Sequence, residues 1–272
     1  MNTEACDSCP AHVQMAKMGV EIANCDHVVA LAGNPNTGKS SVFNALTGLR
    51  QHVGNWTGKT VTRAEGAFGY GGKRYKLVDL PGTYSLLSAS HDEEISRNFL
   101  LFGQPDCTVV VVDATALERN LNLVLQVLEI TDRAVVCVNL MDEAKRKGIE
   151  VDVRSLSRDL GVPAVSTVAR TKEGLSDLVA SVAGVASGET KTSPSRVAPP
   201  TEVQEAIDGL VPLIQGMAPG LPSARWVALR LLDGDHKVRE ALLSGELAGL
   251  ADRQQQPAPL DASRIKAIAG AQ

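Results

Sequence analysis

Residues 33–41 read Gly33-Asn34-Pro35-Asn36-Thr37-Gly38-Lys39-Ser40-Ser41. This stretch is a complete G-x-x-x-x-G-K-S phosphate-binding loop, and it lies between an apolar run at 28–32 and a helix-like run at 42–46. The pattern predicts a strand, a glycine loop and a helix whose backbone N–H groups surround phosphates. We expect Lys39 to contact the β- and γ-phosphates and the Ser40 hydroxyl to bind Mg²⁺. The chain is therefore predicted to bind a nucleoside triphosphate.

A second motif points to the base. The apolar run 134–138 ends in Asn139-Leu140-Met141-Asp142, an Asn-x-x-Asp pattern at the carboxyl end of a predicted strand, where open α/β sheets bind ligands. The Asp142 carboxylate can accept hydrogen bonds from N1–H and the exocyclic amine of guanine, whereas adenine offers neither donor there. The same four residues also suit a helix N-cap. We expect guanine specificity, because the motif lies at the carboxyl end of a predicted strand, where a ligand would bind.

A third motif completes the set. The strand-like run 74–79 ends at Asp79 and continues Leu80-Pro81-Gly82. This Asp-x-x-Gly pattern predicts that Asp79 holds a Mg²⁺-bound water and that the Gly82 amide binds the γ-phosphate, a contact that is lost on hydrolysis. The order of the motifs along the chain predicts a GTPase that converts GTP to GDP and phosphate.

Composition agrees with an enzyme of this class. The chain has 272 residues, a net charge of −4 and 3% aromatic residues. These values suit an aliphatic α/β core with a smaller second domain, and they offer no basic surface for a nucleic acid. The apolar runs fall short of the ~18 residues that cross a bilayer, and the first residues do not resemble a secretion signal.

The cysteines fall into two groups. Cys107 and Cys137 belong to predicted buried strands, where cysteine behaves as a small apolar residue. Cys6 and Cys9 form a C-x-x-C pattern followed by His12, which is the spacing of metal ligands, and Cys25 and His27 could complete a site. The alternative is a mobile or docked terminal arm without metal. Both interpretations stay open.

The alternation of predicted elements indicates an α/β fold with a mostly parallel sheet and helices on both faces, as in Ras-like P-loop GTPases, followed by a small all-α domain. The glycine-rich turn at 69–72 predicts an antiparallel hairpin at the edge of the sheet. Strands are expected at 28–32, 61–68, 74–79, 107–113, 134–138 and 162–166. Helices are expected at 42–46, 92–102, 119–131, 153–160, 175–182, 202–214, 224–232, 236–243 and 263–269.

The composition of residues 187–201 changes to small, polar and proline residues, which is typical of a linker. We therefore divide the chain into an N-terminal extension at 1–26, a GTPase domain at 27–186, the linker at 187–201 and a helical domain at 202–272.

Longer strings resemble one family. The run Gly33 to Lys39, the run Val53-Gly54-Asn55-Trp56-Thr57-Gly58-Lys59-Thr60-Val61 and the run Asp79-Leu80-Pro81-Gly82-Thr83-Tyr84-Ser85-Leu86 resemble the cytosolic region of the FeoB ferrous-iron transporters. The helical tail is similar to the helical insert of that family, and the resemblance covers roughly residues 27–250.

This resemblance implies a role for the chain. It would be the GTP-binding and GTP-hydrolysing front portion of a membrane protein, at the cytoplasmic face of the bacterial inner membrane, where it regulates Fe(II) uptake. Its partners would be guanine nucleotide and the membrane-embedded remainder of the same polypeptide, with no nucleic acid. Self-association stays open.

The resemblance also implies roles for residues. Thr60 would bind Mg²⁺ and hold the attacking water, while Asn36 with the carbonyls of Gly54 and Trp56 would bind K⁺. Thr83 and Tyr84 stand where other GTPases carry a water-positioning glutamine. The catalytic set is then Asn36, Lys39, Thr60 and Gly82. The nucleotide-binding set is Gly33, Asn34, Asn36, Thr37, Gly38, Lys39, Ser40, Ser41, Thr57, Gly58, Thr60, Asp79, Gly82, Asn139, Met141, Asp142, Val168 and Ala169.

Two positions depart from the usual GTPase pattern. Leu140 replaces a lysine whose stem packs over guanine, and Val168-Ala169-Arg170 replaces a Ser-Ala-Lys motif. We align Ala169 so that its N–H would meet guanine O6.

Alternatives to the transporter remain at this stage. A soluble regulatory GTPase of ribosome assembly or RNA modification would carry the same motifs, although residues 202–270 are not a basic RNA-binding appendage. In a third interpretation the helical domain inhibits nucleotide release, as a GDI-like module.

Overall fold

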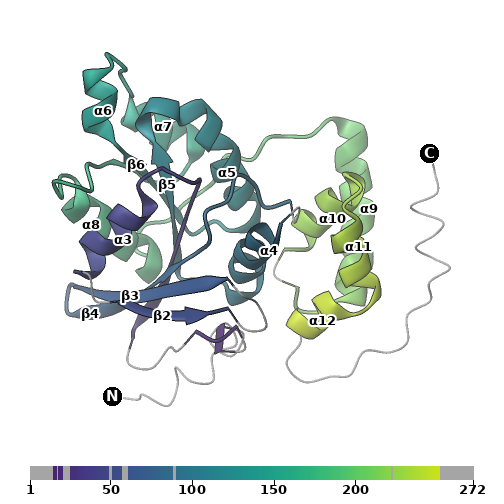
Figure 1. Ribbon diagram of the computed structural model, residues 1–272. Helices are drawn as coiled ribbons and strands as arrows, with labels where there is room; N and C mark the ends of the chain where they lie inside the picture. Colours follow the sequence, from purple (N-terminus) through teal and green to yellow (C-terminus); the bar gives the residue numbers. More distant parts are fainter. Residues whose placement is uncertain are drawn as a thin grey trace. The chain divides into compact units, whose positions relative to one another are not determined.

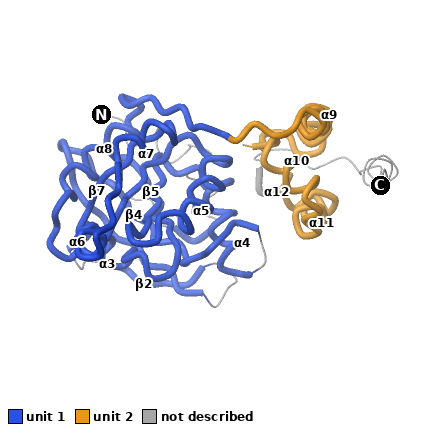
Figure 2. Tube along the Cα trace, turned by 90° about the horizontal axis from the view of Figure 1, so that it is seen from above, with its two compact units in different colours: residues 1–196 blue, residues 197–272 orange. Residues whose placement is uncertain are grey.

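The structure is a computed structural model that describes residues 15–16, 18–20, 25–48, 51–56, 61–87, 90–221 and 223–251. Contacts divide the chain into two compact units, residues 1–196 and residues 197–272 (Figure 2).

The first unit contains a seven-stranded sheet in the order β2-β3-β4-β1-β5-β6-β7 (Figure 1). β4, β1, β5, β6 and β7 pair in parallel, whereas β2, β3 and β4 pair antiparallel. The strands are β1 (His27–Gly33), β2 (Gln51–Asn55), β3 (Thr62–Tyr70), β4 (Lys73–Asp79), β5 (Cys107–Asp113), β6 (Ala134–Asn139) and β7 (Ala164–Ser166). The predicted mostly parallel α/β sheet is confirmed.

The antiparallel hairpin β3–β4 is also confirmed. Its turn uses Gly71 and Gly72, with φ of +57° and +75°, values that favour glycine and match the twist of a tight hairpin. The hairpin is not the edge of the sheet, however. β2 pairs outside β3, and the sequence did not predict it because Gln51–Asn55 lacks alternation and contains Gly54.

Helices cover both faces of the sheet (Figure 1). Successive β1 residues alternate between two apolar clusters: Val28 and Ala30 belong to one, Val29 and Leu31 to the other. The first cluster includes side chains of α5, and the second includes side chains of α3 and α8. A strand that is buried on both faces must be apolar throughout, which explains the valine-rich strands.

The helices of the first unit are close to those predicted. The predicted helix 92–102 is split: α4 begins after a capping box formed by Ser90 and Glu93, and a π-helical turn, η1, follows. The bounds are α3 (Lys39–Thr47), α4 (His91–Asn98), η1 (Phe99–Gly103), η2 (Ala114–Ala116), α5 (Leu117–Ile130), α6 (Met141–Arg146), α7 (Val153–Leu160) and α8 (Leu175–Ser187).

Residues after α8 pack back onto the first unit. The Ser193 amide donates to Gly161 O and the Ser195 amide donates to Leu160 O, each at 3.0 Å. The Arg196 guanidinium donates to Leu128 O at 3.1 Å and pairs with Asp132. These contacts place the end of the first unit at residue 196.

The second unit is helical in its described part. Its helices are α9 (Thr201–Met217), α10 (Ala224–Leu232), α11 (His236–Leu243) and α12 (Glu246–Ala251). The buried side chains of this unit include Ile207, Ile214, Trp226, Val227 and Val238. α10 and α11 have the predicted bounds, and the expected helix 263–269 lies outside the described residues. In the part of the chain that the structure describes, no helix has the length and apolar character needed to cross a membrane.

Candidate nucleotide-binding site

The phosphate loop connects β1 to α3 as predicted. Gly38 has φ of +79°, and a Cβ on it would lie 2.3 Å from Asn139 Nδ2. Asn36 also has a positive φ, +67°, and its side chain is exposed. In the described structure α3 has no side-chain cap and no acidic residue in its first turn. Its first N–H groups therefore suit an anion.

Lys39 joins the loop to the segment after β4. Its Nζ pairs with Asp79 Oδ1 and donates to Leu80 O at 2.8 Å. Both side chains are mostly buried, and burial raises the pKa of Asp79 while the Lys39 charge opposes that rise. The Thr83 amide donates to Gly33 O at 3.3 Å, so the segment from Asp79 to Thr83 lies against the phosphate loop. The first and third motifs are thus brought together.

Asn139 joins the phosphate loop to the loop after β7. Its Nδ2 donates to Thr37 O at 3.0 Å, and its Oδ1 accepts from the Ala169 amide at 3.1 Å and from Thr167 Oγ1 at 3.3 Å. Because Asn139 is fully buried, these bonds fix the orientation of its amide. One N–H of Nδ2 remains for a ligand. The Ala169 amide already donates to Asn139, so a base oxygen would share or compete for that donor.

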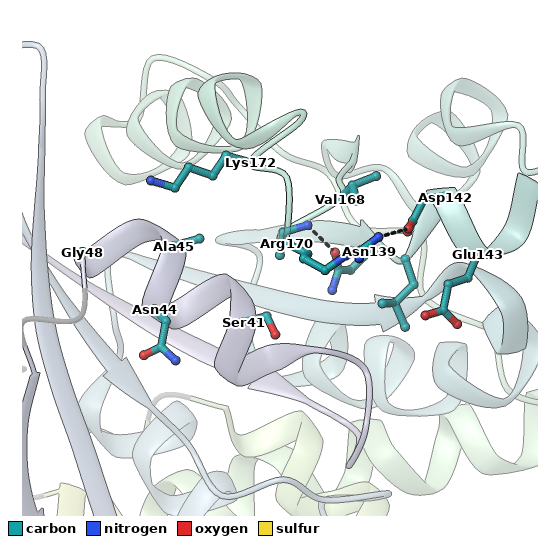
Figure 3. A pocket seen from close by; sticks show the side chains of 12 residues that line it. Ser41, Asn44, Ala45, Gly48, Asn139, Asp142, Glu143, Val168, Arg170 and Lys172 are labelled. Carbon is teal, nitrogen blue, oxygen red and sulfur yellow. Dashed lines mark hydrogen bonds and ion pairs between the residues drawn. The ribbon is translucent and has the colours of Figure 1, made fainter.

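A pocket of about 590 Å³ lies between α3 and the loop after β7 (Figure 3). Asp142 and Asn139 lie on its β6–α6 side, and Ser41, Asn44 and Ala45 come from α3. The lining residues are Ser41, Asn44, Ala45, Gly48, Asn139, Leu140, Asp142, Glu143, Val168, Ala169, Arg170 and Lys172. Five of these lining residues were predicted from the sequence to bind nucleotide: Ser41, Asn139, Asp142, Val168 and Ala169. Met141 begins α6 and is not among the lining residues.

The carboxylate of Asp142 has cationic partners. Arg170 Nη2 lies 3.2 Å from Asp142 Oδ2, and Arg146 Nη2 lies 3.7 Å from the same oxygen. Arg170 belongs to the loop after β7 and Asp142 to α6, so this pair connects two walls of the pocket (Figure 3). The other carboxylate oxygen, Oδ1, is not used in these pairs. A carboxylate held in this way can accept hydrogen bonds from the N–H groups of guanine.

The segment from Pro81 to Leu86 is held by α4 and α5. Ser96 Oγ donates to Pro81 O at 3.3 Å, and the Leu86 amide donates to Gln126 Oε1 at 2.6 Å. The guanidinium of Arg119 lies 4.7 Å from the centre of the Tyr84 ring. The sequence motifs did not reveal Arg119 or Gln126, because both lie on a helix with an ordinary amphipathic pattern.

The other predicted residues are less closely assembled. Gly54 and Trp56 lie at the end of the edge strand β2, which β3 and β4 separate from β1 and its loop with Asn36. Thr57, Gly58 and Thr60 lie outside the described residues, as do Cys6, Cys9 and His12.

Among the described residues no group of histidine, cysteine and carboxylate side chains could hold a metal ion. Burial raises the pKa of the Cys137 thiol to about 12 and also raises that of Cys107.

The fold and these contacts define a P-loop nucleotide-binding domain of the GTPase class. Residues 27–182 match the family described as Ferrous iron transport protein B, and residues 200–265 match its FeoB cytosolic helical domain. The chain belongs to the ferrous iron transport protein B family, which confirms the resemblance drawn from the sequence.

Two relatives with established names support the same family assignment. The chain is 39% identical over 230 residues to the Fe(2+) transport protein A/Fe(2+) transporter FeoB fusion protein of Porphyromonas gingivalis, covering 82% of this chain and 27% of the relative. It is 38% identical over 242 residues to the Fe(2+) transporter FeoB of Salmonella typhimurium, covering 85% of this chain and 31% of the relative. The chain thus spans less than a third of the length of these relatives.

A solved structure supports the fold and the class of ligand. The cytosolic domain of the T. maritima FeoB iron transporter in its GMPPNP form has a TM-score of 0.72 and 35% identity, covering 85% of this chain and 88% of that chain. The same domain has also been solved in a GDP form. Similar domains therefore bind guanine nucleotide.

Proposed function

We propose that this chain is the GTP-binding and GTP-hydrolysing domain pair of a ferrous iron transport protein, and that it regulates Fe(II) uptake. The observation that carries the proposal is the position of Asn139. It bonds to Thr37 of the phosphate loop and to Ala169 of the loop after β7. These bonds join a phosphate cradle to a pocket that contains the Asp142 carboxylate.

The wider assignments belong to the same proposal. Residues 27–186 would form the GTPase domain and residues 202–272 the helical domain, joined by the linker 187–201. The partner would be a membrane-embedded remainder of the same polypeptide, at the cytoplasmic face of the bacterial inner membrane.

The residues at the phosphate end have distinct tasks in this proposal. Lys39 would leave Asp79 and Leu80 O to hold the β- and γ-phosphates, and the Gly82 amide would bind the γ-phosphate. The Ser40 hydroxyl and the Asp79 carboxylate offer the oxygen ligands that Mg²⁺ prefers, and Thr60 would complete the set. Bound Mg²⁺ would neutralise phosphate charge. With Thr83 and Tyr84 after Gly82, the Thr60 carbonyl would orient the attacking water.

The residues at the base end would select guanine. Asp142 would accept from N1–H and the exocyclic amine, and Asn139 would donate its remaining N–H to the base. Ala169 would share its amide between Asn139 and the guanine oxygen. Leu140, which lines the pocket with φ of +63°, would pack against the base plane.

The assignment of Asn36 gives a test of catalysis. If Asn36 and the carbonyls of Gly54 and Trp56 hold K⁺, the rate of GTP hydrolysis should rise in KCl and not in equal NaCl. Bound K⁺ would supply the positive charge that other GTPases take from an arginine finger. Asn36→Ala should abolish the difference between the two salts and leave the GDP dissociation constant nearly unchanged, because the side chain of Asn36 is exposed at the tip of the loop.

The measurement is phosphate release under saturating GTP in the two salts. Half-buried Asn44, which lines the base pocket at another point of α3, gives the control Asn44→Ala, which should keep the potassium stimulation. An equal rate in KCl and NaCl for the unmodified chain would remove the cation assignment without affecting the guanine site.

A second prediction concerns nucleotide release. Leu140 replaces a base-clamping lysine and Val168 replaces a serine, and each change removes on the order of 1 kcal/mol of binding. Together the two changes remove about 2 kcal/mol, so GDP affinity should be about 30-fold weaker than in GTPases that carry the lysine and the serine. Because affinity differences fall mostly in the off-rate, GDP should leave within seconds without an exchange factor. Stopped-flow release of a fluorescent GDP analogue measures this rate, and a lifetime of many minutes would contradict the prediction.

A further inference from the structure

Ser96, on α4, carries a buried hydroxyl that contacts the segment after β4. The residue is 2% exposed, and its Oγ donates to Pro81 O at 3.3 Å. A buried hydroxyl is costly without a partner, so this bond satisfies Ser96 as well. Its acceptor belongs to the peptide unit that ends in the amide of Gly82. The proposed function assigns that amide to the γ-phosphate.

The helix that carries Ser96 is fixed to the core close to this bond. Ile95, the preceding residue, is 7% exposed and belongs to the first apolar cluster. The same cluster contains Leu80 and Leu86, which lie on either side of the Pro81–Gly82 peptide in the sequence. Because close-packed interiors resist displacement, the position of Ser96 relative to that peptide is set by the core.

The other backbone donors of this segment are already used. The amides of Leu80 and Thr83 donate to carbonyls of β1 at 2.9 Å and 3.3 Å. Pro81 has no N–H group. Among the residues that the structure describes, the Gly82 amide has no hydrogen-bond acceptor. Of the donors in residues 80–83, it is therefore the one that remains for a ligand.

The bond from Ser96 sets the direction of that amide. A trans peptide unit is planar, so its C=O and N–H groups point in opposite directions. Because Ser96 holds the carbonyl of the unit, the Gly82 N–H points away from Ser96. Gly82 also lies against the phosphate loop, since a Cβ on it would be 3.6 Å from Pro35 N. The free amide is thus held beside the loop that would bind the phosphates.

This peptide would rotate easily without an external bond. Its rotation changes ψ of Pro81 and φ of Gly82. Glycine adopts positive and negative φ with similar ease, and the proline ring fixes its own φ but not its ψ. A hydrogen bond from outside the segment is therefore needed to select one orientation, and Ser96 supplies it.

We propose that Ser96 is a positioning residue for recognition of the γ-phosphate. Its hydroxyl holds Pro81 O so that the Gly82 amide is presented to the γ-phosphate of GTP. The inference rests on the proposed function, which supplies the contact between Gly82 and the γ-phosphate. Because GDP has no γ-phosphate, Ser96 affects the binding of GTP and not that of GDP.

The test uses four single substitutions in the full chain. Ser96→Ala removes the hydroxyl. Ser96→Thr keeps it, and Ser96→Val has the shape of threonine without it, so this pair isolates the hydrogen bond. Ser157→Ala is the matched control, because Ser157 Oγ, on α7, likewise donates to a backbone carbonyl, that of Val162, at 2.8 Å. The dissociation constants of GDP and of the GTP analogue GMPPNP, the kcat for GTP and the unfolding temperature are measured for each with Mg²⁺ present.

The proposal predicts a change in the ratio of the two affinities. Ser96→Ala and Ser96→Val should bind GMPPNP about tenfold more weakly than the parent does, since a hydrogen bond to a charged group contributes a factor of this size or more. Their kcat should fall about tenfold, because the amide also stabilises charge on the γ-phosphate in the transition state. GDP affinity should stay unchanged in every variant. Ser96→Thr and Ser157→Ala should match the parent in both nucleotide affinities and in kcat.

Three results would overturn the proposal: an unchanged GMPPNP affinity in Ser96→Ala, an equal loss of GMPPNP and GDP affinity, or the same affinity ratio in Ser96→Thr and Ser96→Val. An equal loss would show that Ser96 only supports the fold. If the added methyl group prevents both larger variants from folding, Ser96→Ala against Ser157→Ala decides the case.

Failure of the proposed function gives a different result. A parent that binds both nucleotides without hydrolysing GTP would reject the catalytic part of that function, and the affinity ratio would still decide the role of Ser96. A parent that binds neither nucleotide would overturn both.

Discussion

Replacing Lys39 by alanine is expected to lower GTP affinity by about 10²–10³-fold. A lysine that contacts two phosphates makes charge-assisted hydrogen bonds worth about 1.5–3 kcal/mol each, and alanine supplies neither. Lys39 is placed for this task at the first position of α3, where it meets Asp79 and Leu80 O. Fluorescent GTP-analogue titration measures the change.

Controls separate binding from folding. Asp79 is mostly buried and would lose its ionic partner in Lys39→Ala, so thermal unfolding without nucleotide must be compared with that of the parent. Lys39→Arg keeps the charge with a different shape and should bind GTP more weakly than the parent does. Lys147→Ala, at the exposed end of α6, should leave affinity unchanged. Undiminished GTP binding by a folded Lys39→Ala protein would refute the phosphate-loop assignment.

Replacing Asp142 by asparagine is expected to reverse base preference. The carboxylate accepts two hydrogen bonds from guanine, whereas an amide offers one acceptor and one donor, which matches xanthine. GTP affinity should fall about 100-fold, from the loss of bonds to a charged acceptor, while xanthosine triphosphate affinity should rise. Competition against a fluorescent nucleotide gives both values.

The pairing of Asp142 with Arg170 calls for its own control. Arg170→Gln removes that ion pair and keeps the carboxylate, so it should preserve the preference for GTP over xanthosine triphosphate. Arg170 is 78% exposed, and an exposed ion pair contributes little. If Asp142→Asn leaves GTP affinity unchanged, Asp142 serves only as a residue of the first turn of α6, and guanine selection must come from elsewhere in the pocket.

The sequence predicted the parts of this protein that depend on local pattern. Gly33 to Ser41 predicted the β1–α3 connection, and the valine-rich runs predicted β5 and β6, because a strand buried on both faces must be apolar. The bounds of α7, α10 and α11 followed from amphipathic periodicity and from glycine at or near the helix ends. The mostly parallel α/β fold with a helical second part is confirmed.

The sequence could not predict features that depend on long-range contact. β2 is held by pairing with β3 and has no strand pattern of its own. The bond from the Ala169 amide to Asn139 and the ion pair of Arg170 with Asp142 join residues that are far apart in sequence. In the sequence Arg63 resembles an ordinary polar residue on a strand, but in the structure it is buried and donates to Met18 O and Gly19 O. Side-chain partners of this kind follow from topology, which no local motif encodes.

The most direct test of the central assignment is phosphate release by the purified chain from GTP and from ATP, at equal concentration with Mg²⁺ and K⁺ present. Lys39→Ala serves as the background. We predict that GTP is hydrolysed above that background and that ATP is not, because adenine cannot donate the hydrogen bonds that the Asp142 carboxylate accepts. Equal release from ATP and GTP, or release from GTP no faster than with Lys39→Ala, would contradict the account.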